Sequence, residues 1–456
     1  MHSPRRLLSV AMLWLALGSS QAVAEEPSAT PPVASQRQSM LEVGSTVGQG
    51  FQRQELLGGL AHYSARLHVG PGAHDVITLH RVVRESSPWH PAPSPRSVFM
   101  IHGDAWNFTG AFLASTVSPS AQAADHSIAL YLAQQGVDVW GIDLRWTHVP
   151  LETQDFGFMA GWNMGTHVRD VGLGLGLARA VRLGTGSGAG RLHLLGWSRG
   201  ALLGYAYLSA ETQRPAALHH VAGFIPVDMV LKFGPEGAQQ KAWACERLAL
   251  AQQAQQAGRV EGGLLGPGAG LGVKLMGDLA TLAPDEPTPL MPLPLSNRQV
   301  ALIGGAATFS LFAPLQAAVP AYHFTAGQFS EQGLPLAVSH VSEPFFLNVL
   351  SQARPYQDFN EVVEGEALMC DSQDLPYDDH LAQVKVPVLY VGAAGGFGQF
   401  GVHSTTLLGS TDVSIHLVQN LPGEARLLDY GHADLFLASD ARERVWAPIL
   451  AWMQRH

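Results

Sequence analysis

The sequence predicts an α/β fold, in which helices flank a mostly parallel central sheet. Two observations support this prediction. Apolar runs of strand length alternate with stretches of helical periodicity between residues 97 and 228, and such alternation is typical of a parallel sheet covered on both faces. The composition agrees, because 46% of the 456 residues are hydrophobic and only 14% are charged, which is sufficient for a substantial core.

The type of apolar run predicts how each strand is buried. Residues 65–69 and 76–83 mix apolar and polar side chains, as half-exposed antiparallel strands do. Residues 97–101 and 137–142 are continuous apolar runs, which are typical of strands buried on both faces. Further strands are predicted at residues 191–195, 221–227, 386–392, 413–418 and 425–428. Helices are predicted at residues 128–135, 165–183, 201–210 and 440–454, the last with a kink at Pro448.

The alternation stops at residue 230 and resumes near residue 386. The intervening stretch is rich in Leu, Ala, Gly and Pro and is too long for a plain loop, so it predicts a large inserted lid domain between the sixth and seventh strands. The predicted organisation is a signal peptide (1–24), a flexible leader (25–45), a core in two parts (46–229 and 385–456) and the lid (230–384).

The first residues have the build of an export signal. Arg5 and Arg6 precede an apolar run at residues 7–18, and Ala22-Val23-Ala24 supplies small residues for cleavage. The run is too short to span a bilayer, and no later run is long enough, so we expect an exported protein, secreted or periplasmic, without a transmembrane segment. In an oxidising compartment Cys245 and Cys370 are expected to form one disulfide, although two separate buried thiols are the alternative.

Charge and spacing argue against several classes of partner. The formal net charge is −10 and Lys/Arg runs are absent, which argues against nucleic acid or an anionic membrane surface. No Cys/His spacing indicates a metal site, because the adjacent His219 and His220 would point to opposite faces of a strand. No metal or other cofactor is expected.

A Gly-x-Ser-x-Gly motif joins the central strand to a helix. In Gly196-Trp197-Ser198-Arg199-Gly200 the two glycines lack the Cβ atoms that would clash across a tight strand-to-helix turn, the nucleophile elbow. Such a turn holds a serine hydroxyl exposed. We therefore predict that Ser198 is a catalytic nucleophile, with a plain Gly/Ser loop as the alternative.

Two further features supply what a serine nucleophile needs. His432 follows the last predicted strand and a turn glycine, so it is the candidate general base. An oxyanion needs N–H donors, which the backbone of Arg199 and the loop after His102-Gly103 would supply, the second through Asp104. Asp104 could otherwise be a simple turn residue.

Taken together, these motifs resemble the α/β-hydrolase superfamily. His102-Gly103, the Ser198 pentapeptide and His432 occur in that superfamily's order. A weaker similarity links the chain to acid lipases of the gastric and lysosomal type, through residues 136–140 and 430–436. The resemblance implies an α/β-hydrolase fold and a serine hydrolase with a Ser-His-acid triad.

The chain departs from the acid lipases at the third catalytic residue. Those enzymes carry an Asp after the strand that corresponds to residues 388–392, but here the following loop, residues 393–401, has no carboxylate. Other members of the superfamily place the acid after the preceding strand, where this chain has Asp228. We predict Asp228 as the triad acid, with a cap or turn residue as the alternative. The other candidate acids are Asp434, Asp412 and Asp429.

The sequence thus predicts an exported serine hydrolase that cleaves carboxylic esters through an acyl-enzyme. An apolar lid favours hydrophobic substrates, either small esters or lipid-like ones. Two alternatives stay open. The same triad would serve a C–C bond or amide hydrolase, and the missing carboxylate in residues 393–401 would also suit a non-catalytic exported binding protein on the same fold.

Overall fold

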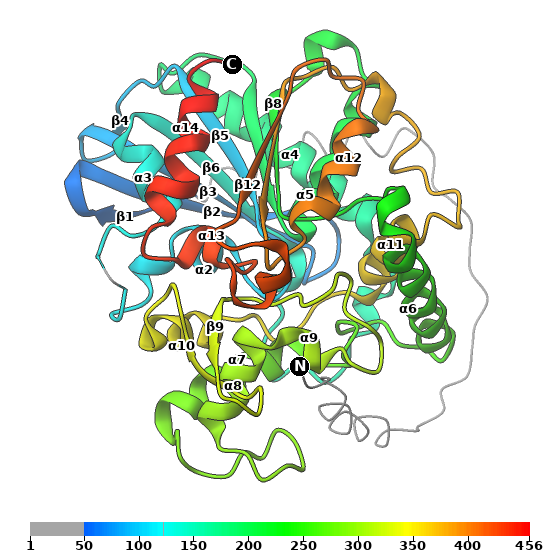
Figure 1. Ribbon diagram of the computed structural model, residues 1–456. Helices are drawn as coiled ribbons and strands as arrows, with labels where there is room; N and C mark the ends of the chain where they lie inside the picture. Colours follow the sequence, from blue (N-terminus) through cyan, green and yellow to red (C-terminus); the bar gives the residue numbers. More distant parts are fainter. Residues whose placement is uncertain (1–49, 122) are drawn as a thin grey trace.

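The computed structural model describes residues 50–121 and 123–456, so the predicted signal peptide and leader (1–45) lie outside the described residues. A ten-stranded sheet dominates the structure (Figure 1). Its strand order is β1-β2-β3-β6-β5-β7-β8-β11-β12, with β4 paired to β3. The pairs β1–β2, β2–β3 and β3–β6 are antiparallel, and every pair from β6 to β12 is parallel, which confirms the predicted mostly parallel sheet.

The strands lie close to the predicted runs. Their bounds are β1 (Gln52–Leu56), β2 (Leu60–His68), β3 (Val76–Ser87), β4 (His90–Pro91), β5 (Arg96–Ile101), β6 (Val137–Asp143), β7 (Leu192–Trp197), β8 (Val221–Val227), β11 (Val388–Ala393) and β12 (Val413–Val418). The flanking helices are α2 (Phe108–Phe112), α3 (Ile128–Gln134), α4 (Met164–Gly184), α5 (Arg199–Glu211), α12 (Val402–Thr406), α13 (Asp434–Leu437) and α14 (Ala447–Met453).

Two hydrophobic cores form because successive side chains of a strand point to opposite faces. On β5, Phe99 and Ile101 belong to the core shared with α4 and α5, whereas Val98 and Met100 belong to the core shared with α3 and α14. The continuous apolar runs therefore serve both faces, as predicted from their composition. None of the helices in the described part of the chain combines the length and apolarity needed to cross a membrane.

The segment between β8 and β11 carries its own secondary structure, and we call it the inserted segment (residues 228–387). Its elements are α6 (Ala238–Gln256), α7 (Ala269–Leu282), α8 (Asn297–Ala306), α9 (Thr308–Leu311), β9 (Gly327–Phe329), β10 (Pro335–Val338), α10 (Glu343–Ser351) and α11 (Phe359–Cys370). In Figure 1, α7, α8 and α10 gather below the sheet, while α6 and α11 lie side by side. Cys245 of α6 and Cys370 of α11 form a disulfide, so the bond joins the first and last long helices of this segment.

Replacing both cysteines with serine is expected to lower the free energy of unfolding by about 2–5 kcal/mol, because the crosslink restricts the unfolded chain. The two cysteines are 125 residues apart in sequence, so the loop that the bond closes is long. Urea denaturation of the double variant, compared with the oxidised wild-type protein, measures the effect. A reducing agent should shift the wild-type curve toward that of the variant, and superimposable curves for all samples would contradict the expectation.

Two local predictions need correction. Residues 425–428 were expected to form a strand, but Gly423–Leu428 is a 3-10 helix with no buried residue. The reason is the Asp429 side chain, which accepts the N–H groups of Asn420 and Leu421 and closes this stretch into a compact loop. In the C-terminal helix a π-helical turn (Arg442–Trp446) precedes α14, and Pro448 lies in the first turn of α14, where a missing N–H costs little.

Candidate active site

Ser198 sits at a sharp turn between β7 and α5. Its backbone is at φ 56°, ψ −129°, a strained conformation that costs about 1–3 kcal/mol for a residue with a side chain. The turn is possible because its flanking residues are glycines: a Cβ on Gly196 would overlap the carbonyl oxygen of Gly200, and a Cβ on Gly200 would overlap that of Ile101. Ser198 is partly exposed, whereas the residues on either side of it are buried. A partly exposed serine at such a turn is the geometry of a nucleophile elbow.

The parallel strands bring Ser198 and Asp228 to the same edge of the sheet. The Ser198 N–H donates to the Val227 carbonyl at 2.9 Å, and the Asp228 N–H donates to Val391 at 2.7 Å. Gly103, at the end of β5, lies against the serine, because a Cβ added there would be 3.3 Å from Ser198 Oγ. The loops after β5, β7, β8 and β11 thus meet around one point.

Asp228 and His432 form a buried pair. His432 Nδ1 donates to Asp228 Oδ2 at 2.7 Å, and the two residues are 2% and 0% exposed. Because the carboxylate accepts from Nδ1, the imidazole is held in one orientation and its Nε2 is left to act as a base when the ring is neutral. Asp228 directly follows the last residue of β8, Val227.

The loop without a carboxylate supports Asp228 through its backbone. The N–H groups of Ala393 and Gly398 donate to Asp228 Oδ1, each at 2.9 Å, and the Phe397 N–H donates to Oδ2 at 3.1 Å. A side chain at Gly396 would overlap Oδ2, so this position requires glycine. Residues 393–401 therefore hold a carboxylate that arrives from the neighbouring strand, which the composition of the loop alone does not reveal.

Aromatic rings surround the imidazole. Trp197 stacks on His432 with ring centroids 5.1 Å apart, and the rings of Tyr322, Phe397 and Phe324 lie at 5.5, 5.9 and 6.4 Å. The backbone N–H of His432 donates to the backbone carbonyl of His323, in the inserted segment, at 3.0 Å. Within the described residues no hydrogen bond joins His432 to the Ser198 hydroxyl, and Trp197, the residue before Ser198, contacts the imidazole by stacking.

Asp104 and Arg199, predicted for their backbone N–H groups, also contact each other through their side chains. Arg199 begins α5, so its N–H has no acceptor in a preceding turn. Its Nε donates to Asp104 Oδ1 at 2.6 Å, and Gln357 Nε2 donates to the same oxygen at 2.7 Å. The ion pair ties the loop after β5 to the elbow. No local sequence signal marks Gln357, a residue of the inserted segment, as a neighbour of Asp104.

The other candidate acids have different partners. Asp434 is buried, accepts the N–H groups of Gly431 and Ala326 at 2.7 Å, and has its pKa raised to about 7 by burial. Asp429 closes the 420–430 loop, and Asp412 lies 3.1 Å from the His456 ring. None of these three carboxylates is hydrogen-bonded to the imidazole of His432 in the described structure, whereas Asp228 is.

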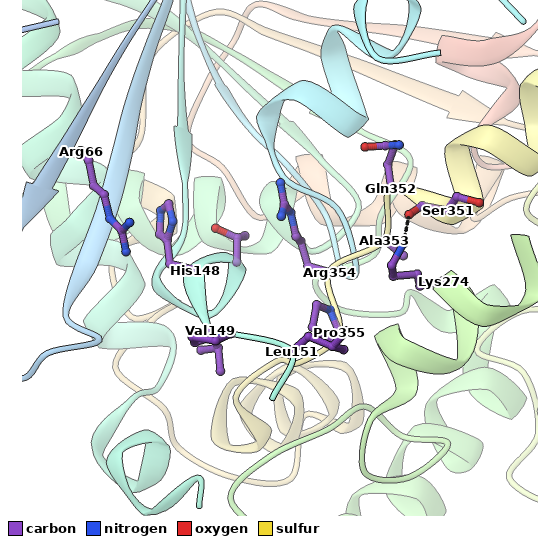
Figure 2. A pocket seen from close by; sticks show the side chains of 12 residues that line it. Arg66, His148, Val149, Leu151, Lys274, Ser351, Gln352, Ala353, Arg354 and Pro355 are labelled. Atoms are coloured by element: carbon purple, nitrogen blue, oxygen red, sulfur yellow. Dashed lines mark hydrogen bonds between the residues drawn. The ribbon is translucent and has the colours of Figure 1, made fainter. Parts of the chain in front are cut away.

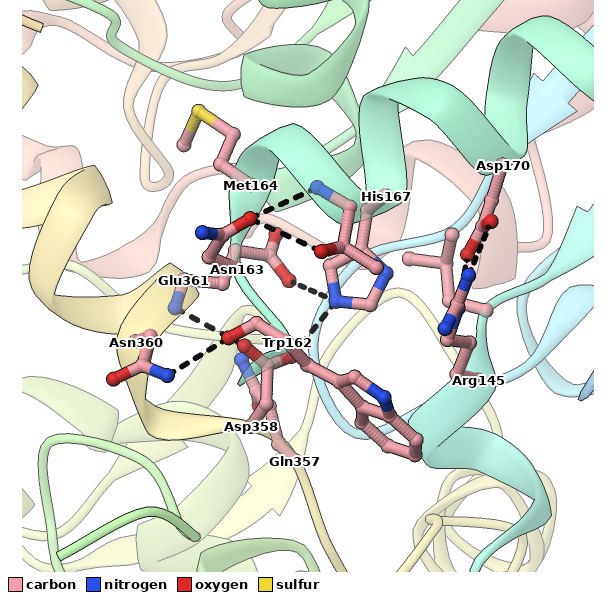
Figure 3. A network of polar contacts seen from close by, with 12 residues as sticks. Arg145, Trp162, Asn163, Met164, His167, Asp170, Gln357, Asp358, Asn360 and Glu361 are labelled. Atoms are coloured by element: carbon pink, nitrogen blue, oxygen red, sulfur yellow. Dashed lines mark hydrogen bonds and ion pairs between the residues drawn. The ribbon is translucent and has the colours of Figure 1, made fainter. Parts of the chain in front are cut away.

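One buried cluster has donor atoms close enough to hold a divalent cation. His167, Asp358 and Glu361 are all fully buried and their donor atoms lie within 4.8 Å of one another (Figure 3). His167 Nε2 is 2.8 Å from Asp358 Oδ2, the length of a direct hydrogen bond, and 3.4 Å from Glu361 Oε2. No local spacing in the sequence marks this cluster, because His167 lies on α4 and the two carboxylates lie at the start of α11, and these helices meet only through tertiary packing.

A proton stabilises this cluster. Although burial acts in the opposite direction, Asp358 and Glu361 raise the pKa of His167 to about 9, so it pairs with Asp358 as a cation. Burial raises the pKa of Glu361 to about 8, and neither of its oxygens has a hydrogen-bond partner among the described residues. Burial therefore favours the protonated form of Glu361.

The variant Glu361→Gln is expected to gain stability relative to wild type as the pH rises from 5 to 8. The folded wild-type protein retains a proton that the unfolded chain releases above about pH 4.5, so its stability falls through this range until the pH passes the folded pKa. Glutamine cannot ionise, so the variant does not lose this part of its free energy of unfolding, which is on the order of a few kcal/mol. Urea midpoints at pH 5 and pH 8 test this, with the exposed Glu424→Gln as control. Parallel pH profiles for wild type and Glu361→Gln would contradict the expectation.

Comparison with known proteins establishes the fold. No protein-family model matches the chain, and a search of curated sequences finds no match. A candidate lipase from Sulfolobus solfataricus is similar in structure, with a TM-score of 0.59 and 18% identity over 89% of this chain and 99% of that one. A soluble variant of monoglyceride lipase from Saccharomyces cerevisiae, in complex with a substrate analog, matches with a TM-score of 0.45 and 12% identity over 89% and 94%. The chain has the α/β-hydrolase fold.

Proposed function

We propose that the protein is an exported serine hydrolase that cleaves carboxylic esters. Ser198 is the nucleophile, His432 the general base and Asp228 the acid that orients it. The observation that carries the proposal is a strained serine at the elbow whose chain neighbour, Trp197, stacks on a buried imidazole, the Nδ1 of which lies 2.7 Å from a carboxylate. The Cys245–Cys370 disulfide supports export, because such bonds persist in oxidising compartments.

The chemistry proceeds through an acyl-enzyme. Ser198 Oγ attacks the ester carbonyl while His432 Nε2 takes its proton, and the Asp228 carboxylate stabilises the imidazolium that forms. The N–H groups of Arg199 and Asp104 donate to the oxyanion of the tetrahedral intermediate. Collapse of the intermediate expels the alcohol, which receives the proton from His432. A water molecule, activated by the same imidazole, then releases the acid and restores Ser198.

The surroundings of His432 favour substrates with apolar groups. Trp197, Phe324 and Phe397 are buried beside the imidazole, and Trp106 stacks on Phe324 at 4.9 Å. Such rings stabilise apolar groups by roughly 25 cal/mol per Å² of surface removed from water. Because Phe324 and Tyr322 belong to the inserted segment, this segment contributes to the proposed substrate site and is proposed to act as its lid.

Hydrolysis of matched chromogenic substrates tests the ester assignment. A p-nitrophenyl ester, the corresponding p-nitroanilide and a β-diketone of the same acyl group separate an esterase from an amide or C–C bond hydrolase. We expect the ester to be cleaved with the highest kcat/KM. Preferential cleavage of either other substrate would assign the same triad to that reaction, and no turnover of any of them would favour a binding protein.

A further inference from the structure

A concave site lies between the core and the inserted segment. It is a pocket of about 450 Å³ (Figure 2). The core contributes Arg66 from β2 and His148 from the turn after β6, and the inserted segment contributes Lys274 from α7 and Arg354 from the loop after α10. Thr147, Val149, Pro150, Leu151, Ser351, Gln352, Ala353 and Pro355 complete the lining.

The pocket is basic in a chain whose formal net charge is −10. Its lining includes two arginines, a lysine and a histidine but no carboxylate. Lys274 is partly compensated, because its Nζ lies 3.1 Å from Asp278 and donates to the Ser351 carbonyl at 2.8 Å. The charge of Arg354 is not compensated in this way. Its Nε is buried and has no hydrogen-bond partner among the residues described.

The charge is concentrated around His148. Burial, together with the positive charges of Arg66 and Arg354, lowers the pKa of His148 to about 4, against the opposing effect of Asp143. In Figure 2, Arg66, which is exposed, and Arg354 lie on either side of His148. Uncompensated guanidinium groups that converge on one cavity favour an anion, which they bind through charge-assisted hydrogen bonds.

The pocket lies at the same sheet edge as Ser198. The Arg354 N–H donates to the carbonyl of Ala105, the residue after Asp104, at 2.6 Å. Because β2 and β6 run in the same direction, Arg66 and His148 lie at the edge where β7 ends in Ser198. Two strand spacings, about 10 Å, separate β7 from β6, after which His148 follows, and four spacings, about 19 Å, separate β7 from β2, which carries Arg66.

We propose that this pocket binds an anionic group, a carboxylate or phosphate, carried by the ester substrate at the far end from the scissile bond. This inference rests on the proposed esterase function. An ester that spans the two sites would place its apolar chain beside the aromatic rings around His432 and its charged end between Arg66 and Arg354. The preferred substrates are then amphiphilic esters with one negative charge, not neutral esters of the same length.

A pair of substrates with equal chain length tests the charge preference. The mono-p-nitrophenyl ester of suberic acid ends in a carboxylate, and p-nitrophenyl octanoate ends in a methyl group. We expect wild-type kcat/KM to be higher for the suberate ester, and the suberate-to-octanoate ratio to fall about tenfold in Arg66→Gln and in Arg354→Gln, as expected for the loss of one charge-assisted contact. Arg96→Gln, an exposed change at the start of β5, should leave the ratio unchanged. An unchanged ratio in both pocket variants would overturn the proposal.

Inorganic phosphate distinguishes a substrate group from a free anion. If the pocket holds the substrate's own charge, phosphate should compete and lower the ratio in wild type. If phosphate instead alters octanoate hydrolysis while wild type shows no preference for suberate, the pocket binds a free anion and the substrate assignment is wrong. Calorimetry of monoethyl suberate with Ser198→Ala, compared with Ser198→Ala/Arg354→Gln, separates this result from a failure of the esterase assignment, because it measures binding without turnover. Equal affinities would count against the pocket even if esters are cleaved.

Discussion

Replacing Ser198 with alanine is expected to abolish ester hydrolysis and labelling by a fluorophosphonate probe. The probe forms a covalent bond only with an activated serine. At the elbow, Ser198 is the residue with a hydroxyl that could be activated. A serine hydrolase that loses its nucleophile typically loses kcat on the order of a million-fold, with residual catalysis from the oxyanion donors and substrate binding. Gel fluorescence after labelling and a p-nitrophenyl ester assay measure both effects.

The control for this experiment is Ser86→Ala, because Ser86 is exposed at the end of β3 and its hydroxyl donates to the His90 carbonyl. It should be labelled like the wild-type protein. Thermal unfolding of Ser198→Ala checks that the variant is folded, since alanine keeps a Cβ at φ 56° and so keeps the strain of the turn. Labelling that persists in folded Ser198→Ala would show that another residue is the nucleophile.

The sheet could be predicted because its signal is local. A strand covered on both faces must be apolar at every position, so the runs at residues 97–101 and 137–142 identify β5 and β6 with little help from the rest of the chain. Half-exposed β12 was also found, at residues 413–418. The failure at residues 425–428 has the opposite cause, since Asp429 captures neighbouring N–H groups and no strand-forming pattern records that contact.

Some residues of the candidate site could also be predicted from a local sequence signal, and others could not. Ser198 carries a local signal, because glycines two residues before and after it are needed for the turn. The position of Asp228 at the end of a strand could be predicted. Its three backbone donors from residues 393–398 could not, because every residue except proline has an N–H and only the folded structure determines the direction in which each one points. Contacts such as Gln357 with Asp104 join residues 253 positions apart, and no pattern in a single sequence encodes them.

Replacing Asp228 with asparagine is expected to lower kcat by about four orders of magnitude while KM changes little, by analogy with the same change in other Ser-His-Asp hydrolases. The geometry gives the reason. Ala393 and Gly398 donate to Oδ1, so the asparagine oxygen will take that position and its NH₂ group will face His432. Nδ1 must then accept a hydrogen bond, which leaves the proton on Nε2. In that tautomer the imidazole cannot take the proton of Ser198.

Asp434→Asn is the matched control for this change. Asp434 is as buried as Asp228 and lies two residues from His432, but its Oδ2 accepts two backbone N–H groups and its Oδ1 has no partner in the described structure. Asparagine can keep the oxygen where the donors are and place its NH₂ at the free position. Burial raises the pKa of Asp434 to about 7, so the change removes roughly half a negative charge at pH 7 but leaves the contact between His432 and Asp228 in place, and we expect kcat within a few-fold of wild type. Equal losses in the two variants would mean that buried charge near the loop, and not the orientation of the imidazole, limits turnover. Near-normal turnover in Asp228→Asn would remove Asp228 from the proposed triad.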